Sequence, residues 1–250
     1  MKSKNFDDAW LYSTPITHRG LYDENHPENT QPAFEEAIRL GYGIEMDVQM
    51  TLDDVLVVYH DNNLKRVCGV DKDIRDLTYE EVKTLRPMGK DYPIMTLKEF
   101  LELVDGRTPI LVEVKHQKRK GIEKLVVQHL KNYNGKFAVQ SFNPQIVYRM
   151  TKLAPNFIAG VLVTREKSAL APWIINKLIH AFAFKLYIKF NFLSLRAQDL
   201  PLCYKRVGNY KVIAWTVKTE EDIKNAEKYA DNIIFEKDVP TLSKFGEKKF

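Results

Sequence analysis

The repeated alternation of short apolar segments with amphipathic segments constrains the fold of this chain more than any other feature. Strands are expected at 15–18, 43–48, 55–59, 109–114, 137–140, 157–163, 192–195, 211–217 and 232–235. Helices are expected between most of them, at 30–40, 78–85, 96–104, 121–132, 143–153, 201–207 and 220–229. Strands that alternate with helices predict a parallel sheet in an α/β fold. The main strands among these nine number about eight, which predicts a closed (β/α)8 barrel, the TIM barrel.

Size and composition agree with a folded protein that binds small anions. The chain has 250 residues, of which 44% are hydrophobic and 28% are charged, which argues against intrinsic disorder. The formal net charge of +5 favours anionic ligands. We find no zinc-finger spacing and no helix-turn-helix pattern, and therefore expect no nucleic-acid partner.

The cysteines and the lack of long apolar segments indicate where in the cell the protein is expected. Cys68 and Cys203 are too few and too far apart for a disulfide framework, so we expect a reducing, cytoplasmic location. The first eight residues are polar, with no signal-peptide core, and no stretch of about 20 residues lacks charge.

Acidic residues alternate at the ends of two expected strands. Glu45 and Asp47 are two positions apart, as are Glu113 and Lys115. Side chains at i and i+2 of a strand point to one side, and the carboxyl ends of barrel strands carry functional groups. Converging carboxylates need a cation, and oxygen-only ligands favour hard ions such as Mg²⁺ or Ca²⁺. The alternative is that each acid is an ordinary surface charge.

Two histidines are candidates for acid–base chemistry. His18 and His60 each end an expected strand beside another polar group, and histidine titrates near neutral pH. Asp61 follows His60 and either orients its imidazole or belongs to a turn.

The positive and aromatic candidates are Arg19, Lys115 and Trp215. Arg19 offers a planar fork of donors to a phosphoryl group, and Lys115 offers a compact positive charge. Both could instead pair with nearby acids. Trp215 either packs against apolar carbons of a substrate or fills the core. Asn29 and Thr30 precede a helix, and we expect them to act as caps.

The segment 173–190 has apolar residues at helical spacing, flanked by lysines. We expect a helix that packs on the barrel core; the alternative is a helix that lies on a membrane surface.

These motifs together resemble the glycerophosphodiester phosphodiesterase family, over most of the chain and in the expected order. The first sixty residues carry the most specific part of the resemblance. The matching text is His18-Arg19-Gly20, Pro27-Glu28-Asn29-Thr30, Glu45-Met46-Asp47-Val48-Gln49, Val57-Val58-Tyr59-His60-Asp61, Leu64 with Arg66, Glu113 with Lys115, Ser141-Phe142 and Trp215-Thr216-Val217.

The resemblance implies one domain over residues 1–250, a TIM barrel with a small insertion at about 61–95, after the second barrel strand. It also implies one divalent cation, Mg²⁺ or Ca²⁺, held by Glu45, Asp47 and Glu113. His18 and His60 become the general acid and base, and Arg19 and Lys115 bind phosphate. The implied reaction cleaves a glycerophosphodiester, a small-molecule substrate, to sn-glycerol 3-phosphate and an alcohol.

Two other functions stay open at this point. The same chemistry could act on lysophospholipids at a membrane surface, as a lysophospholipase D, with contact through 173–190. A barrel that binds anionic metabolites without catalysis is the third hypothesis, although both histidines and all three acids are present. The loop after 235 departs from the family pattern, which leaves its substrate contacts undefined, and the oligomeric state does not follow from the sequence.

Overall fold

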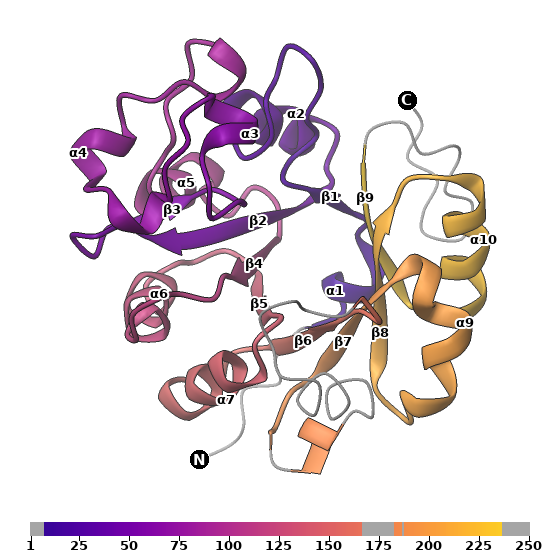
Figure 1. Ribbon diagram of the computed structural model, residues 1–250. Coiled ribbons are helices and arrows are strands. Elements are labelled where there is room, and N and C mark those ends of the chain that lie inside the picture. The colour runs from indigo at the N-terminus through magenta and orange to yellow at the C-terminus, as the bar shows by residue number, and fades with distance from the viewer. Residues whose placement is uncertain (1–7, 167–182, 187, 237–250) are drawn as a thin grey trace. The chain divides into compact units, whose positions relative to one another are not determined.

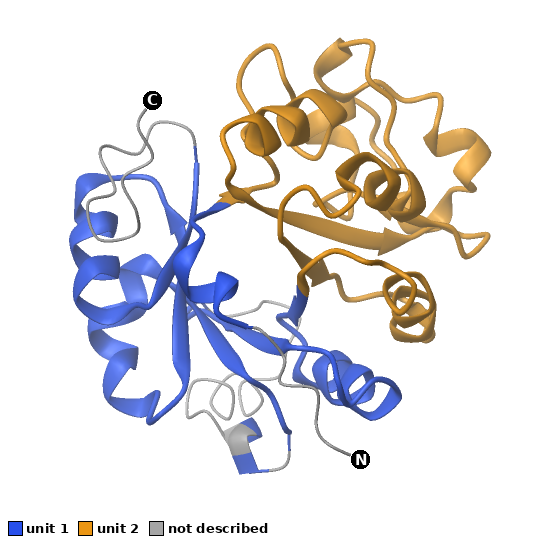
Figure 2. Cartoon of the chain, turned by 180° about the vertical axis from the view of Figure 1, so that it is seen from behind, with its two compact units in different colours: residues 1–16, 138–250 blue, residues 17–137 orange. Residues whose placement is uncertain are grey.

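The computed structural model describes residues 8–166, 183–186 and 188–236 (Figure 1). The chain divides into two compact units (Figure 2). Unit 2 comprises Thr17–Phe137, and unit 1 comprises Met1–Ile16 with Ala138–Phe250.

Unit 2 is organised around the long strand β2, Gly43–Met50. Strand β2 pairs in parallel with β4, Ile110–Val114, and in antiparallel fashion with β3, Leu56–Val58. It also pairs with β1, Ile16–His18. All eight residues of β2 are buried, including its two acidic ones. The strand therefore contributes both apolar side chains to the core and buried polar side chains.

Three amphipathic helices cover these strands: α2, Gln31–Arg39; α5, Leu97–Val104; and α6, Ile122–Leu130 (Figure 1). Helix α2 packs on β2 and on α5, where the rings of Phe34 and Phe100 meet edge to face at 4.7 Å. Helix α5 begins with a capping box, in which Thr96 and Glu99 exchange side chain-to-backbone hydrogen bonds.

The residues between β3 and α5 form a small subregion with its own apolar cluster. Its short helices are α3, Lys65–Cys68; η1, Ile74–Asp76; α4, Tyr79–Val82; and η2, Pro87–Gly89. The cluster includes Leu64, Ile74, Val82 and Ile94, and Val57 and Tyr59 near β3 pack into it. These residues include the range 61–95, for which the insertion stays a prediction.

Unit 1 contains five strands, each parallel to the next in chain order. They are β5, Phe137–Ser141; β6, Ala159–Val163; β7, Phe192–Arg196; β8, Lys211–Val217; and β9, Asn232–Phe235. Its helical elements are α1, Trp10–Ser13; α7, Pro144–Leu153; η3, Ala183–Leu186; η4, Ala197–Asp199; α9, Leu200–Cys203; η5, Tyr204–Arg206; and α10, Glu220–Tyr229.

The observed strands follow the expected ones closely, and two helices differ. The helix expected at 201–207 is a short α9 followed by the 3₁₀ turn η5. The helix expected at 78–85 ends at Val82. Most of 173–190 lies outside the described residues, so both interpretations of that segment stay predictions. Within the described ranges, no helix has the length and apolar character needed to cross a bilayer.

Candidate active site

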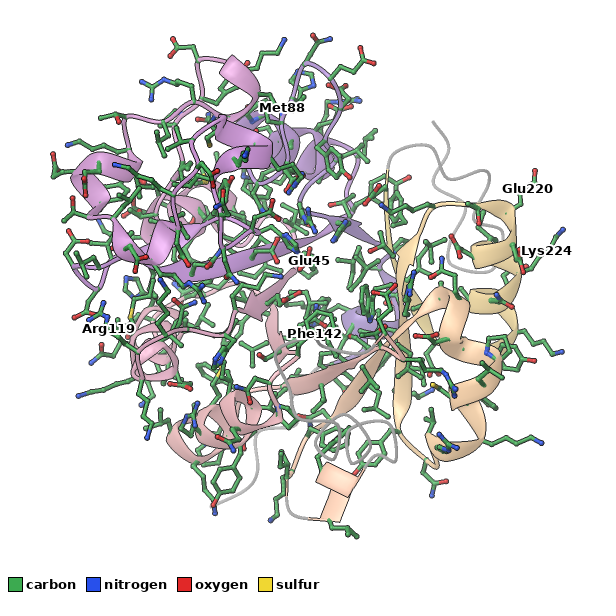
Figure 3. The ribbon with its side chains drawn as sticks, in the orientation of Figure 1. Glu45, Met88, Arg119, Phe142, Glu220 and Lys224 are labelled. Carbon is green, nitrogen blue, oxygen red and sulfur yellow. The ribbon has the colours of Figure 1, made fainter. Side chains whose placement is uncertain are left out.

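Three buried carboxylates converge in unit 2. Glu45 and Asp47 both come from β2, and Glu113 lies on β4, where its Cα pairs with that of Asp47 (Glu45 is labelled in Figure 3). Their ligand atoms all lie within 4.8 Å of one another. The side chains are almost fully enclosed, since the exposed fractions of Glu45, Asp47 and Glu113 are 2%, 1% and 6%. Alternation along β2 and parallel pairing with β4 together bring the three predicted acids to one point.

The surroundings shift the pKa values of the two acids on β2 in opposite directions. Burial, reinforced by repulsion from Asp47 and Glu113, raises the pKa of Glu45 well above its usual value. Burial also disfavours the charged form of Asp47. Electrostatic interactions with Lys115, His60 and Arg19, and the hydrogen bond from Asn29, outweigh that penalty and hold the pKa of Asp47 below its usual range.

Lys115 contacts two of the three carboxylates directly. Its Nζ lies 2.5 Å from Glu113 Oε1 and 2.9 Å from Asp47 Oδ1. Burial opposes its charge, but the two carboxylates dominate and raise the pKa of Lys115. Pairing with acids, one of the two roles expected for this lysine, is therefore present in the structure.

Arg19 contributes its backbone as well as its side chain. Its N–H donates to Glu45 Oε2 at 3.1 Å, and its guanidinium binds Glu28 Oε1 at 2.8 Å. Arg19 has φ +58° and Gly20 has φ +79°, two successive left-handed residues. A Cβ at position 20 would lie 2.9 Å from backbone atoms of Ala33, so this turn needs glycine.

His60 lies next to the cluster and is held by Asp61. The Tyr59 N–H donates to Asp47 O at 3.1 Å, which fixes the chain just before His60 against β2. His60 Nδ1 lies 2.6 Å from Asp61 Oδ1, so the carboxylate contacts the imidazole, one of the two expected roles. The amide of Gln49 donates to the carbonyls of residues 59, 60 and 61 and so holds this loop against β2.

His18 ends β1 between two residues that contact β2. Thr17 Oγ1 donates to Gly43 O at 3.0 Å, and the Arg19 N–H binds Glu45 as described above. The backbone of His18 therefore runs beside β2 at the carboxylate cluster. Seven of the eight predicted site residues lie within unit 2: His18, Arg19, Glu45, Asp47, His60, Glu113 and Lys115.

The eighth, Trp215, belongs to β8 of unit 1. Its indole N–H donates to Ser194 O at 3.0 Å, and its ring meets that of Phe142 edge to face at 5.2 Å. Phe142, labelled in Figure 3, is 39% exposed. The substrate contact of Trp215 stays a prediction.

Comparison with known proteins identifies the family. The model of the glycerophosphoryl diester phosphodiesterase family matches residues 18–236, from the histidine of the first motif to the end of the last strand. A glycerophosphodiester phosphodiesterase of Caldanaerobacter subterraneus subsp. tengcongensis is 32% identical over 240 residues, which cover 91% of this chain and 95% of that relative. The chain belongs to the glycerophosphoryl diester phosphodiesterase family.

Two further comparisons extend this result. Human lysophospholipase D GDPD1 is 38% identical over 135 residues, which cover 49% of this chain and 42% of the human protein. An Oleispira antarctica phosphodiesterase, solved in complex with the product sn-glycerol-3-phosphate, superimposes with a TM-score of 0.69 at 23% identity and covers 90% of this chain and 92% of that one. The phosphodiesterase family, the enzyme class and the (β/α)8 barrel predicted from the sequence are thereby confirmed.

Sequence reasoning missed the polar residues that support this phosphodiesterase site. Asn29 was expected to act as a cap, which is wrong: its Nδ2 donates to Asp47 Oδ2 at 2.9 Å. Thr30 holds the N-cap position of α2, but its hydroxyl donates to Pro27 O instead of capping. Glu28 and Arg66, which belong to the matching text but received no role, form ion pairs beside the site.

The donor set of the phosphodiesterase cluster suits a hard divalent cation. Among the described residues, the three carboxylates outnumber the two permanently charged side chains that face them, Arg19 and Lys115. Together with the burial of Glu45, which is the larger cause, this excess of negative charge raises the pKa of Glu45. A divalent cation bound by oxygen ligands would relieve this excess while leaving all three groups ionised.

Proposed function

We propose that this chain hydrolyses glycerophosphodiesters to sn-glycerol 3-phosphate and an alcohol with the help of one divalent cation. The observation that carries the proposal is the buried cluster of Glu45, Asp47 and Glu113, flanked by Arg19 and Lys115. Membership of the phosphodiesterase family and the names of the relatives supply the substrate class.

In this proposal Glu45, Asp47 and Glu113 would hold Mg²⁺ or Ca²⁺. The ion supplies positive charge for the phosphate oxygens and lowers the pKa of a hydroxyl or water beside it. Arg19 and Lys115 then complete the phosphate site. The guanidinium of Arg19 binds two oxygens through parallel N–H donors, and the ammonium of Lys115 acts as a point charge.

His18 and His60 carry the protons. One imidazole removes the proton of the neighbouring glycerol hydroxyl as its oxygen bonds to phosphorus, and the other protonates the departing alcohol as the P–O bond breaks. The product of this step is a cyclic phosphate, which water then opens to sn-glycerol 3-phosphate. Direct attack by water on the diester is the alternative, and isolation of the cyclic phosphate during turnover would distinguish the two.

Asp61 prepares His60 for this role. If the Nδ1–H of His60 donates to Asp61, then Nε2 is the nitrogen left to accept or deliver a proton at the substrate. A charged carboxylate at this distance also stabilises the imidazolium that forms when His60 acts as a base.

The proposal is tested by release of choline from glycerophosphocholine, measured with and without EDTA. We expect EDTA to abolish turnover and added Mg²⁺ or Ca²⁺ to restore it. His18→Ala should reduce kcat by at least about 10²-fold, a typical contribution of one proton transfer, with an unchanged circular dichroism spectrum. Full activity in EDTA would contradict the metal role, and full activity of His18→Ala would remove that histidine from the chemistry.

Lysophospholipid hydrolysis is the second candidate, because the human relative matched over residues of this chain is named a lysophospholipase D. The same choline assay with lysophosphatidylcholine presented in vesicles tests it. A higher kcat/KM for lysophosphatidylcholine than for glycerophosphocholine would favour this function over the first.

A further inference from the structure

Arg66 binds two carboxylates at once. Its Nε lies 2.6 Å from Asp61 Oδ2 and its Nη2 lies 3.1 Å from Asp61 Oδ1. On the other edge of the same guanidinium, Nη1 and Nη2 bind the two oxygens of Glu28 at 2.8 and 2.7 Å. Four of the five N–H donors of an arginine are thereby used in two bidentate pairs.

Each of the two carboxylates leads to a different part of the site. Asp61 binds the imidazole of His60 at 2.6 Å. Glu28 binds the guanidinium of Arg19 at 2.8 Å, and Arg19 in turn contacts Glu45 and Asp47. Arg66 therefore connects the His60 loop to the Arg19 turn, two segments about 40 residues apart in the chain.

We propose that Arg66 is a positioning residue that fixes His60 and Arg19 relative to each other through Asp61 and Glu28. Arg66 lies on α3, in the stretch between β3 and α5, so this stretch would serve catalysis by supplying the connecting guanidinium. The inference rests on the proposed function, because it assumes that His60 transfers protons and that Arg19 binds phosphate.

The partners of Arg66 make this arrangement more than a surface ion pair. Isolated exposed pairs contribute little, and the Arg66 side chain is 51% exposed. Glu28 and Asp61, however, are only 10% and 21% exposed. Burial raises the pKa of both carboxyls, but their partners outweigh it. Arg66 and Arg19 lower the pKa of Glu28, and His60 and Arg66 lower the pKa of Asp61. Both acids stay ionised, as bidentate binding requires.

Removal of the guanidinium should therefore affect binding and chemistry together. We expect Arg66→Met to lower kcat/KM by about 10–100-fold, a typical effect of losing a group that orients site residues. The loss should divide between a lower kcat, through His60, and a higher KM, through Arg19. Lys65→Met is the matched control: Lys65 precedes Arg66 on α3 and pairs with the exposed Asp71, and its removal should change kcat/KM by no more than about twofold.

Double variants test the two connections separately. In a Glu28→Gln background, the effect of Arg66→Met on KM should disappear while its effect on kcat persists. In an Asp61→Asn background, the effect on kcat should disappear while the effect on KM persists. A merely structural arginine would act equally in both backgrounds, and that result would overturn the proposal.

Arg66→Lys and chemical rescue keep the test decisive if Arg66→Met folds poorly. Lysine retains the positive charge but not the planar set of N–H donors of the guanidinium. We therefore expect Arg66→Lys to have a native value of at most one of kcat and KM. A hollow lined by Asp61, Asn63, Lys65 and Arg66 opens beside the guanidinium. Millimolar guanidinium should therefore restore kcat to a folded Arg66→Ala variant and leave Lys65→Met unchanged.

Failure of this inference is distinguishable from failure of the proposed function. If His60→Asn is inactive while Arg66→Met and Arg66→Lys keep the kcat and KM of the native enzyme, the function stands and the positioning role of Arg66 is wrong. If His60→Asn is fully active, the proposed function itself fails.

Discussion

At the scale of single residues, the most informative group is a carboxyl whose ionisation the fold disfavours. Glu45 lies among two other acids with an exposed fraction of 2%, and its pKa is raised from 4.5. Because this pKa is higher in the folded chain than in the unfolded chain, the folded chain loses the proton at a higher pH than the unfolded chain does. The free energy of unfolding of the metal-free protein should therefore fall as pH rises.

In the proposed function a divalent cation would compete with this proton, so its stabilising effect should grow with pH. We expect saturating Mg²⁺ or Ca²⁺ to raise the thermal midpoint more at about pH 8 than at about pH 5. The lowered pKa of Asp47 makes the free energy of unfolding rise with pH instead. This contribution changes only at pH values below about 3.8, the usual pKa of the group.

Glu45→Gln is the variant that checks this prediction. It should abolish turnover and remove most of the pH dependence of the cation effect, as measured by thermal denaturation. Glu102→Gln, which alters an exposed pair with Lys98, should keep the native turnover and the native pH dependence of the cation effect. An equal cation effect at the two pH values in the native protein would contradict the raised pKa.

The sequence predicted the acids of the site better than the groups that orient them. Glu45 and Asp47 are recognisable by their alternation within an apolar strand, a local pattern. Asn29 binds Asp47, 18 positions away, and Arg66 binds Glu28, 38 positions away, in addition to the nearby Asp61. No local pattern specifies such pairs, and for Asn29 the helix that follows favoured a cap instead.

At the scale of elements, the turn after β1 decides how Arg19 is presented. Gly20 combines a positive φ with a close approach to Ala33. Gly69, at the end of α3, has φ +73°, and a Cβ added there would meet nothing within 4 Å. Gly69 therefore shares the left-handed backbone of Gly20 but not its steric restriction.

These two glycines form a matched pair of tests. Gly69→Ala should lower the free energy of unfolding by about 1–2 kcal/mol, the cost of a left-handed alanine, and leave kcat/KM unchanged. Gly20→Ala should cost more than Gly69→Ala and also reduce kcat/KM, because the turn must shift and move the Arg19 N–H away from Glu45. Urea denaturation and the choline assay measure both; equal stability losses would contradict the close approach.

Elements with a sustained periodicity were predicted well, and several short helices were not. The strand expected at 109–114 is β4, and the helix expected at 220–229 is α10. Elements of three or four residues, such as α1, α3 and η1, are too short to show a 3.6-residue apolar stripe. Their positions follow from tertiary packing, such as the apolar cluster around Leu64 and Ile74.

At the scale of the whole molecule, the barrel prediction rested on the repeated pairing of strand and helix. The parallel strand pairs within each unit and the match to solved family structures agree with it. The antiparallel β3 is the exception, and the simple alternation of strands with helices did not indicate its direction.

The two cysteines should make no contribution to stability through a disulfide. Both are free; Cys203 is 3% exposed and Cys68 is partly buried. Burial raises the pKa of each thiol, which keeps the reactive thiolate scarce. We expect the same thermal midpoint with and without dithiothreitol and slow labelling of the native protein by a thiol reagent; a midpoint that falls on reduction would contradict this.

The seven polar residues that we propose for the reaction all come from residues 18–115, while Trp215 and the exposed Phe142 come from the later part of the chain. Replacement of the sequence after position 137 would therefore leave these seven residues unchanged. Natural diversification or laboratory shuffling of that downstream coding region offers a route to new substrate preferences without rebuilding the chemistry.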